Sequence, residues 1–275
     1  MLLSVFLAHV LEGAAQQGMD ETAALQAARE MGYRGVECAM GQLTPERIAR
    51  LQACGLQAVS VYAVHELGHQ TADENRRQVQ AHLDAAQAVG AKRVLCVPGF
   101  ARQGEDMNAL RQVIIGPLRE MVAQAGERGI TVGVEDYDLT ASPCAGCDGV
   151  MALLSAVPGL ECVFDTGNFA YMLEDAEAAY RRLRPWVRHV HLKDRRRDAA
   201  FGAPGSALAD VGGKLMYPSP IGEGEVPVER LVKQLARDGY DGFLSVEHFG
   251  AADQMTAMRL SAAHLRDWLG NRLPG

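Results

Sequence analysis

The sequence predicts a single-domain (β/α)8 TIM barrel, in which eight parallel strands alternate with helices. Eight short apolar runs are separated by stretches in which apolar residues have helical spacing. A glycine typically ends the helical stretch before the next run, at Gly32, Gly55, Gly90, Gly129 and Gly239. Eight strands in about 250 residues is the size of such a barrel.

Each predicted strand is a short run rich in apolar and β-branched residues. The runs lie at residues 3–9, 34–39, 57–64, 92–97, 131–136, 160–165, 187–192 and 243–248. Helices are expected between them, for example one that begins at Pro45 after Thr44 and one that follows Asp73 and ends at Val89. This alternation predicts parallel strands in one domain over residues 1–275, with an open doubly wound sheet as the alternative.

The composition is that of a globular protein. Of the 275 residues, 48% are hydrophobic and 22% are charged, which excludes a disordered chain. The 27 Lys and Arg against 34 Asp and Glu give a net charge of −7, and this acidic balance disfavours a nucleic-acid partner because phosphate binding uses basic surfaces. No apolar run reaches about 18 residues, so we expect no membrane partner.

The six cysteines are too dilute for a disulfide framework. Cys144 and Cys147 have CxxC spacing, but no second pair completes a zinc site. We expect the thiols to pack as small hydrophobes in a cytoplasmic protein. The apolar N-terminal segment lacks the basic residues of a signal peptide, and we interpret it as a buried strand.

Four consecutive predicted strands end in residues that bind divalent cations: Glu135, Asp165, His191 and Glu247. The carboxyl ends of barrel strands meet on one face. A carboxylate that follows an apolar run needs a partner, since an unpaired buried charge is costly, and a cation supplies one. Three carboxylates and an imidazole suit Mn²⁺, Mg²⁺, Co²⁺ or a catalytic Zn²⁺. The alternative for each residue is a cap or an ion pair, and Asp165 could cap the turn that follows it.

Neighbouring residues are expected to support this site. His189 and His191 point to the same face of their strand, so His189 is expected one layer deeper, hydrogen-bonded behind the ligands. Asp136 and Asp138 flank Glu135 and are interpreted as structural.

Two earlier strands also end in polar residues, namely Glu37 and the pair His65 and Glu66. Each could contact substrate or lie at the rim of the barrel. The segment 195–227, rich in Gly, Pro and Ala, follows the seventh strand. A loop this long is usually functional, and residues 201–220 are a candidate lid or subunit contact.

Six short sequence motifs of this chain resemble those of the xylose isomerase-like TIM barrel superfamily, and within it those of the sugar phosphate isomerase/epimerase family. The matching strings cover nearly the whole chain in the order that the family shows. They lie at residues 32–37 (GYRGVE), 134–135 (VE), 164–168 (FDTGN), 189–194 (HVHLKD), 222–225 (GEGE) and 246–247 (VE). Together they are specific for the superfamily, and none is specific for a substrate.

The resemblance implies one divalent metal ion, usually Mn²⁺, held by Glu135, Asp165, His191 and Glu247. It also implies that Glu135 and Glu247 form an acid/base pair on opposite faces of the substrate. Such a pair passes a proton through a metal-stabilised enediolate. The expected activity is isomerisation or epimerisation of a sugar or keto-polyol.

The resemblance also implies contacts to the substrate. Arg197, six residues past the ligand of the seventh strand, matches a substrate-binding arginine of ketose 3-epimerases, although it ends a run of three arginines. Asn168, Lys193 and His65 are further candidates. Ala141 stands where those epimerases place a second Glu, and Asn168 where many place a His, so a simple ketose epimerase is disfavoured.

Three other functions stay open. The first is a lyase of the inosose or dehydroshikimate dehydratase type on the same metal site. The second is an abasic-site endonuclease, which needs more histidines than this chain offers near Asn168 and Arg195. The third is a non-catalytic barrel subunit. The expected partners are a small carbohydrate or polyol and further copies of the chain in a homo-oligomer.

Overall fold

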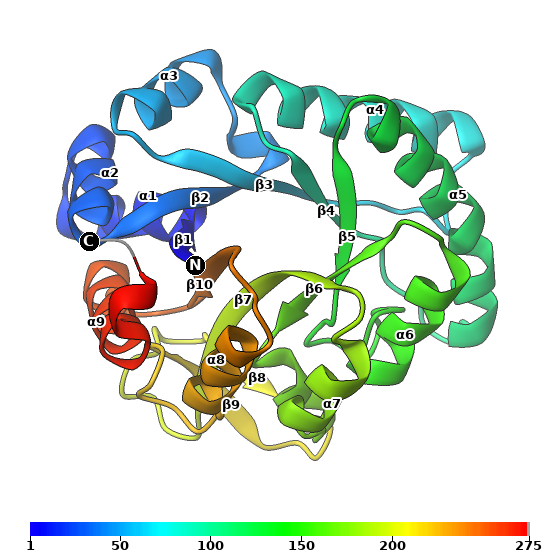
Figure 1. The fold of residues 1–275 in the computed structure, drawn as a ribbon. Coiled ribbons are helices and arrows are strands. Elements are labelled where there is room, and N and C mark those ends of the chain that lie inside the picture. Colours follow the sequence, from blue (N-terminus) through cyan, green and yellow to red (C-terminus); the bar gives the residue numbers. More distant parts are fainter. Residues whose placement is uncertain (274–275) are drawn as a thin grey trace.

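The computed structural model describes residues 1–273 and confirms the predicted barrel. Eight parallel strands form a closed ring (Figure 1), and β10 closes it by pairing with both β7 and β1. The open sheet is therefore excluded. Residues 274 and 275 of the predicted domain lie outside the described residues. The strands of the ring are β1 (Leu2–Phe6), β2 (Tyr33–Ala39), β3 (Gln57–Val64), β4 (Arg93–Val97), β5 (Thr131–Glu135), β6 (Glu161–Asp165), β7 (Val187–Arg196) and β10 (Phe243–Glu247).

The strands are apolar because the sheet is covered on both faces. In β4, for example, residues 94–97 are all buried, although their side chains alternate between the inside of the barrel and the surrounding helices. Burial on both faces explains why uninterrupted apolar runs located the strands.

Helices surround the ring and cover its outer face (Figure 1). The helix predicted after Thr44 is present, and the Thr44 hydroxyl caps it. The helix that ends at Val89 begins at Ala72, earlier than predicted, because Thr71 and Glu74 form a reciprocal capping box. The helices are α1 (Leu7–Gln17), α2 (Glu21–Glu30), α3 (Pro45–Ala53), α4 (Ala72–Val89), α5 (Met107–Glu127), α6 (Gly146–Ala156), α7 (Ala176–Leu183), α8 (Val228–Arg237) and α9 (Gln254–Leu269).

The first predicted strand is shorter than expected. The apolar run 3–9 was predicted as one strand, but β1 ends at Phe6 and α1 begins at the next residue. Leu7 and Val10 are apolar because they lie on the buried face of α1. One apolar run thus contains a strand end and the first turn of a helix, which periodicity does not separate over so few residues.

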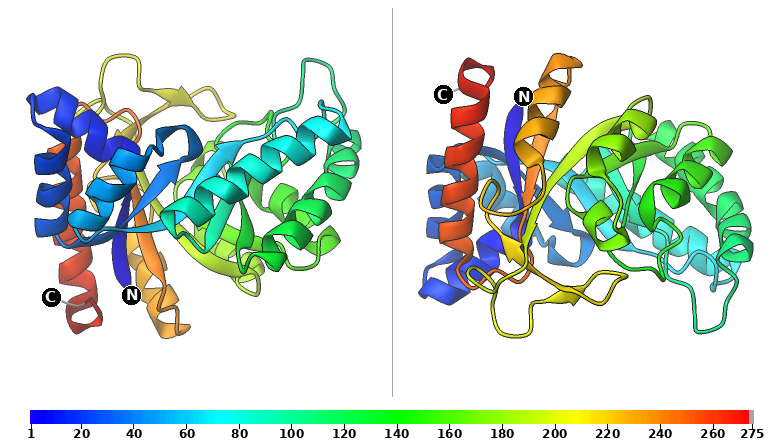
Figure 2. Two further views of the ribbon diagram at one scale, coloured as in Figure 1. Left: turned by 90° about the horizontal axis from the view of Figure 1, so that it is seen from above. Right: turned by 90° about the horizontal axis from the view of Figure 1, so that it is seen from below.

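The segment 195–227 is more regular than predicted. β7 continues to Arg196 and pairs antiparallel with β9 (Leu215–Ser219), which pairs with the short β8 (Leu208–Ala209). Figure 2 shows this yellow segment projecting at the end of the barrel where the parallel strands terminate. Backbone hydrogen bonds from Ala203 to Gly250 and from Ala252 to Phe201 hold it against the loop after β10.

Asp194 anchors the return of this segment to the barrel. Its buried carboxylate accepts backbone N–H groups from Gly222, Gly224 and Val226 at 2.9, 3.0 and 3.1 Å. A Cβ on Gly224 would lie 2.1 Å from Asp194 Oδ1, so a larger residue cannot stand there. The strings at 189–194 and 222–225 therefore form one structural unit.

All six cysteines carry free thiols, and all but Cys54 are buried. Among the helices of residues 1–273, none combines the length and apolar character needed to cross a bilayer.

Candidate active site

Four strands bring the predicted metal ligands together at the carboxyl end of the barrel. Glu135, Asp165 and Glu247 are the last residues of β5, β6 and β10, and His191 lies within β7. One nitrogen or oxygen atom of each lies within 4.8 Å of those of the other three, and all four residues are buried. The predicted set is thus a compact group of four side chains.

His191 lies between two carboxylates. Its Nδ1 is 2.5 Å from Glu135 Oε1, and its Nε2 is 3.0 Å from Glu37 Oε1. Burial opposes the charged imidazole, but Glu37 and Glu135 outweigh it and raise the pKa of His191. An ionised Glu37 only accepts hydrogen bonds, so Nε2 of His191 carries a proton. In its neutral form, His191 would therefore direct the lone pair of Nδ1 towards Glu135.

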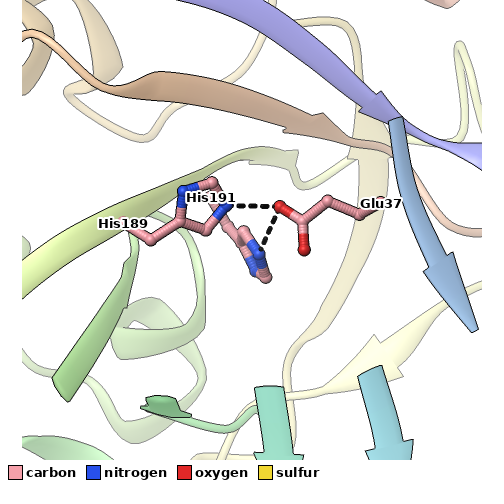
Figure 3. A group of neighbouring side chains, drawn as sticks. All are labelled: Glu37, His189 and His191. Atoms are coloured by element: carbon pink, nitrogen blue, oxygen red, sulfur yellow. Dashed lines mark hydrogen bonds and ion pairs between the residues drawn. The ribbon is translucent and has the colours of Figure 1, made fainter. Parts of the chain in front are cut away.

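A second buried group lies behind these ligands. Figure 3 shows Glu37 bridging His189 and His191, with its Oε1 2.5 Å from His189 Nε2. His189 Nε2 is also 3.2 Å from the Ser245 hydroxyl. Glu37 is fully buried, and the contacts of its Oε1 with both rings orient the two imidazoles. His189 therefore lies where the alternation in β7 predicted it.

Asp165 uses its two oxygens differently. Its Oδ1 accepts the backbone N–H groups of Gly167 and Asn168 at 2.6 and 2.9 Å, so it does cap the turn after β6. Its Oδ2 has no hydrogen-bond partner, although it is buried. One oxygen therefore shapes the backbone and the other is left for a ligand.

Lys193 is the cation of the site. Its Nζ lies 2.6 Å from Glu247 Oε1, 2.7 Å from Asn168 Oδ1 and 3.7 Å from Asp165 Oδ2. Asp138, 3.6 Å away, also faces it, so Asp138 belongs to this charge cluster. Burial opposes the ammonium charge, but Asp165, Glu247 and Asp138 raise the pKa of Lys193.

Burial raises the pKa of all three candidate carboxyl ligands. Desolvation is the largest cause for Glu135 and Glu247, and it raises the pKa of Asp165 to about 6. Lys193 and His191 act in the opposite direction. Burial therefore outweighs the two cations in setting the direction of each pKa shift.

This arrangement fits a divalent cation. Hard oxygen ligands and one imidazole are the donors that Mn²⁺, Mg²⁺ and catalytic Zn²⁺ accept. Asp165 Oδ2 is an unused buried acceptor, and Glu37 fixes the ring of His191 from behind, as outer partners of metal-bound histidines do. The residues present are suited to such an ion.

A cavity of about 430 Å³ opens over this group. Its wall on one side is apolar and comes from β1, β3 and β4. Glu135, Glu247, Lys193 and Asn168 line it from the other side, and Ser206 and Leu208 of the segment 195–227 also line it. The cavity is large enough for a small metabolite.

Two predicted substrate-binding residues lie elsewhere. His65 is buried against α4, with its Nε2 3.0 Å from His82 Nδ1. The Arg197 guanidinium is 2.9 Å from Asp210 Oδ2 and does not line the cavity. Arg195 lines the cavity instead. The alternation of side chains along β7 identifies Arg195 from the sequence, because it places His191, Lys193 and Arg195 on one face of the strand.

Comparisons with known proteins agree with this architecture. The model of the xylose isomerase-like TIM barrel family matches residues 25–268. An inosose dehydratase of Clostridium perfringens is 33% identical over 87 residues, which span 31% of this chain and 29% of that protein.

Solved structures resemble the whole chain. A probable 3-DHS dehydratase, AsbF of Bacillus anthracis, has a TM-score of 0.75 at 18% identity, covering 96% of this chain and 98% of that one. The IolI protein with a bound zinc atom has a TM-score of 0.77 at 16% identity, and both chains are fully covered. A D-tagatose 3-epimerase-like protein has a TM-score of 0.74 at 17% identity, covering 98% and 97%. At these identities the likeness shows the shared fold.

Proposed function

Because the chain belongs to the xylose isomerase-like TIM barrel family, we propose that it is a metal-dependent isomerase or epimerase of a sugar or keto-polyol. The observation that carries this proposal is the pair Glu135 and Glu247. These carboxylates come from separate strands, flank His191 and line the same cavity. Two carboxylates around one bound carbon can take a proton and return it.

Glu135, Asp165, His191 and Glu247 are the proposed ligands of one divalent ion. Mn²⁺ is the first choice because oxygen donors dominate, with Mg²⁺, Co²⁺ and Zn²⁺ as alternatives. When bound, such an ion polarises neighbouring carbonyl and hydroxyl oxygens and so acidifies the adjacent C–H bond.

The protein's own residues would transfer the proton. Burial raises the pKa of both Glu135 and Glu247 towards neutral pH. A carboxyl group whose pKa lies closer to the working pH serves better both as a proton acceptor and as a proton donor. One carboxylate removes the proton from the carbon beside the carbonyl. The other returns a proton either to the former carbonyl carbon, while a proton also passes from the hydroxyl oxygen to the former carbonyl oxygen, or to the opposite face of the same carbon. The first outcome is isomerisation and the second is epimerisation.

Lys193 and Asn168 are the proposed substrate-positioning residues. Their side chains are hydrogen-bonded to each other at 2.7 Å and both line the cavity, so they can reach substrate oxygens. Arg197 and His65 are not proposed as substrate-binding residues. Their side chains contact Asp210 and His82, respectively, and neither residue lines the cavity.

A lyase is the second candidate function. The partial match to an inosose dehydratase favours it. Dehydration begins with the same removal of a proton beside a carbonyl, and Lys193, 2.6 Å from Glu247, could donate a proton to a departing hydroxyl. We propose a small carbohydrate or keto-polyol as substrate for either activity. The expectations of a cytoplasmic location, a homo-oligomer, and no nucleic-acid or membrane partner remain proposals.

The test is product analysis in deuterated water. Mn²⁺-loaded protein is incubated with ketoses, keto-acids and inososes, and the products are measured by mass spectrometry. A product that keeps its oxygen atoms and gains deuterium on carbon supports an isomerase or epimerase. Loss of one water supports the lyase. No conversion, or conversion that the Glu135→Gln variant performs at an unchanged rate, would contradict both.

A further inference from the structure

Arg195 is a buried cation with no anionic partner. Its side chain stands two residues beyond Lys193 in β7 and faces the same cavity, and the residue is only 3% exposed. Within residues 1–273, no carboxylate oxygen lies within 4.0 Å of its guanidinium.

The contacts that Arg195 does make are weak. One Nη1 contact to the Phe249 carbonyl is 3.5 Å long, and the guanidinium carbon lies 5.8 Å from the centre of the Tyr171 ring. Its Nε has no hydrogen-bond partner. A guanidinium has five N–H donors, so most of its hydrogen-bonding capacity is unused.

The cations next to Arg195 in the sequence have different surroundings. Lys193 is close to the carboxylates of Glu247, Asp165 and Asp138. Arg196 pairs with Asp198, and Arg197 pairs with Asp210. Among these four residues, only Arg195 is buried and has no carboxylate in contact with its charged group. A buried charge without a partner is costly unless a ligand supplies the opposite charge.

A second residue that lines this cavity also has an unsatisfied polar group. The Ser206 hydroxyl is buried without a hydrogen-bond partner, and Ser206 lines the same cavity. The acids that line this cavity pair with other cations, Glu135 with His191 and both Glu247 and Asp138 with Lys193. The cavity therefore combines unpaired donors on Arg195 and Ser206 with the carboxylate acceptors of Glu135 and Glu247.

We propose that Arg195 forms an anion subsite, so that the substrate carries one carboxylate or phosphate group in addition to the keto and hydroxyl groups that react. The planar fork of a guanidinium binds the two oxygens of such a group. This inference rests on the proposed function for the reacting end of the substrate, but the anion subsite can be measured by binding alone. Arg195 is thus the residue that selects acidic over neutral substrates.

The experiment compares ligands that differ only in one anionic group. L-sorbose is compared with 5-keto-D-gluconate, in which the terminal carbon far from the ketone is a carboxylate, and D-fructose with fructose 6-phosphate. Dissociation constants are measured by calorimetry on metal-free and on Mn²⁺-loaded protein. We expect at least one charged ligand to bind about 10- to 100-fold more tightly than its neutral partner, as charge-assisted hydrogen bonds allow. The pair that shows the preference tells whether the anion is a carboxylate or a phosphate.

Variants assign the preference to one residue. Arg195→Gln should abolish it, Arg195→Lys should keep part of it, and the matched control Arg196→Gln should leave it unchanged because Arg196 pairs with Asp198 away from the cavity. The lysine variant keeps the test readable if the glutamine variant does not fold. Equal affinity for charged and neutral ligands, or a preference that survives Arg195→Gln, would overturn the anion subsite. Failure of the proposed function would instead appear as a protein that keeps the preference but binds no metal ion.

Discussion

The two halves of the barrel contribute different chemistry to the cavity. The half formed by β1, β3 and β4 provides an apolar wall, whereas the half formed by β5, β6, β7 and β10 provides the acids, the imidazole and the cations. The wall consists of Phe6, Tyr62, Val64, Leu95 and Val97. The fold alone does not require this division, because all eight strands have equivalent ends in a barrel.

The difference indicates how the proposed substrate would lie. Its C–H surface would pack on the apolar wall, and its oxygens would face the charged half. This wall, whose Tyr62 side chain adds a phenol hydroxyl to otherwise apolar groups, offers water few partners. Charges on the opposite side therefore interact more strongly than they would in solvent.

Removing a carboxylate from the charged half should have the largest effect. In Glu247→Gln the side chain keeps its size but cannot accept a proton, so we expect turnover to fall about 10²–10⁴-fold. The control is Glu66→Gln, whose partner is His69 outside the cavity. Rates are measured on the substrate identified in deuterated water, with circular dichroism to check the fold. Equal rates for the two variants would remove Glu247 from the mechanism.

Opening the apolar half should cost stability. Phe6 is buried, and its ring centre lies 5.0 Å from that of His191, 5.5 Å from Tyr62 and 5.4 Å from Phe249. Phe6→Ala should lower the free energy of unfolding by about 3–5 kcal/mol, the usual result of a large cavity in a core. Val113→Ala on the exposed face of α5 is the control. Urea denaturation checks this, and a change below about 1 kcal/mol would show that Phe6 does not support the wall.

Glu37 is the exception to the division, since it comes from β2 but contacts the charged half. Its carboxylate holds His191 by Nε2 at 3.0 Å, so Glu37→Gln should weaken metal binding about 10- to 100-fold while the stoichiometry stays the same. Titration with Mn²⁺ and Zn²⁺ measures both quantities. Unchanged affinity would mean that Glu37 does not orient the ligand.

The smallest effect concerns His65 and His82 behind the apolar half. Burial lowers the pKa of His65 to about 3 and that of His82 to about 4, so both are neutral in the folded protein. The unfolded chain takes up protons near pH 6.5, and stability is therefore lost as the pH falls from about 6.5 towards 4.

His82→Gln removes one of these groups and keeps an amide that can donate to the Val61 carbonyl. The loss of unfolding free energy between pH 7.5 and 5.5 should shrink by about 1 kcal/mol relative to the wild type. His264→Gln, at a partly exposed histidine paired with Glu223, is the control. An unchanged pH dependence would contradict the neutral buried pair.

The sequence predicts the charged half better than the rest, for a physical reason. Glu135, Asp165 and Glu247 directly follow apolar runs, and strand ends in a barrel must meet, so their positions follow from the pattern. The position of Glu37 under two histidines needs the register of β2 against β1 and β3 around the ring, which no local pattern contains.

The arginines show the same limit. The family resemblance favoured Arg197, but β7 continues as a strand to Arg196 because β9 pairs with it. This extension keeps Arg195 on the face of His191 and Lys193 and leaves Arg197 beyond the strand, with Asp210. A hairpin formed by distant residues, 208–219, thus decides which arginine lines the cavity.

The metal content of Asp165→Asn, compared with that of the wild type and of Asp138→Asn, tests whether Asp165 is a ligand of one divalent ion. Asparagine keeps the oxygen that accepts the N–H groups of Gly167 and Asn168 and replaces the free Oδ2, so the turn is preserved while one proposed ligand atom is lost. After loading with Mn²⁺ and dialysis, mass spectrometry should find about one ion per chain in the wild type and in Asp138→Asn, and much less in Asp165→Asn. No bound ion in the wild type, or equal metal content in all three proteins, would contradict the proposed metal site.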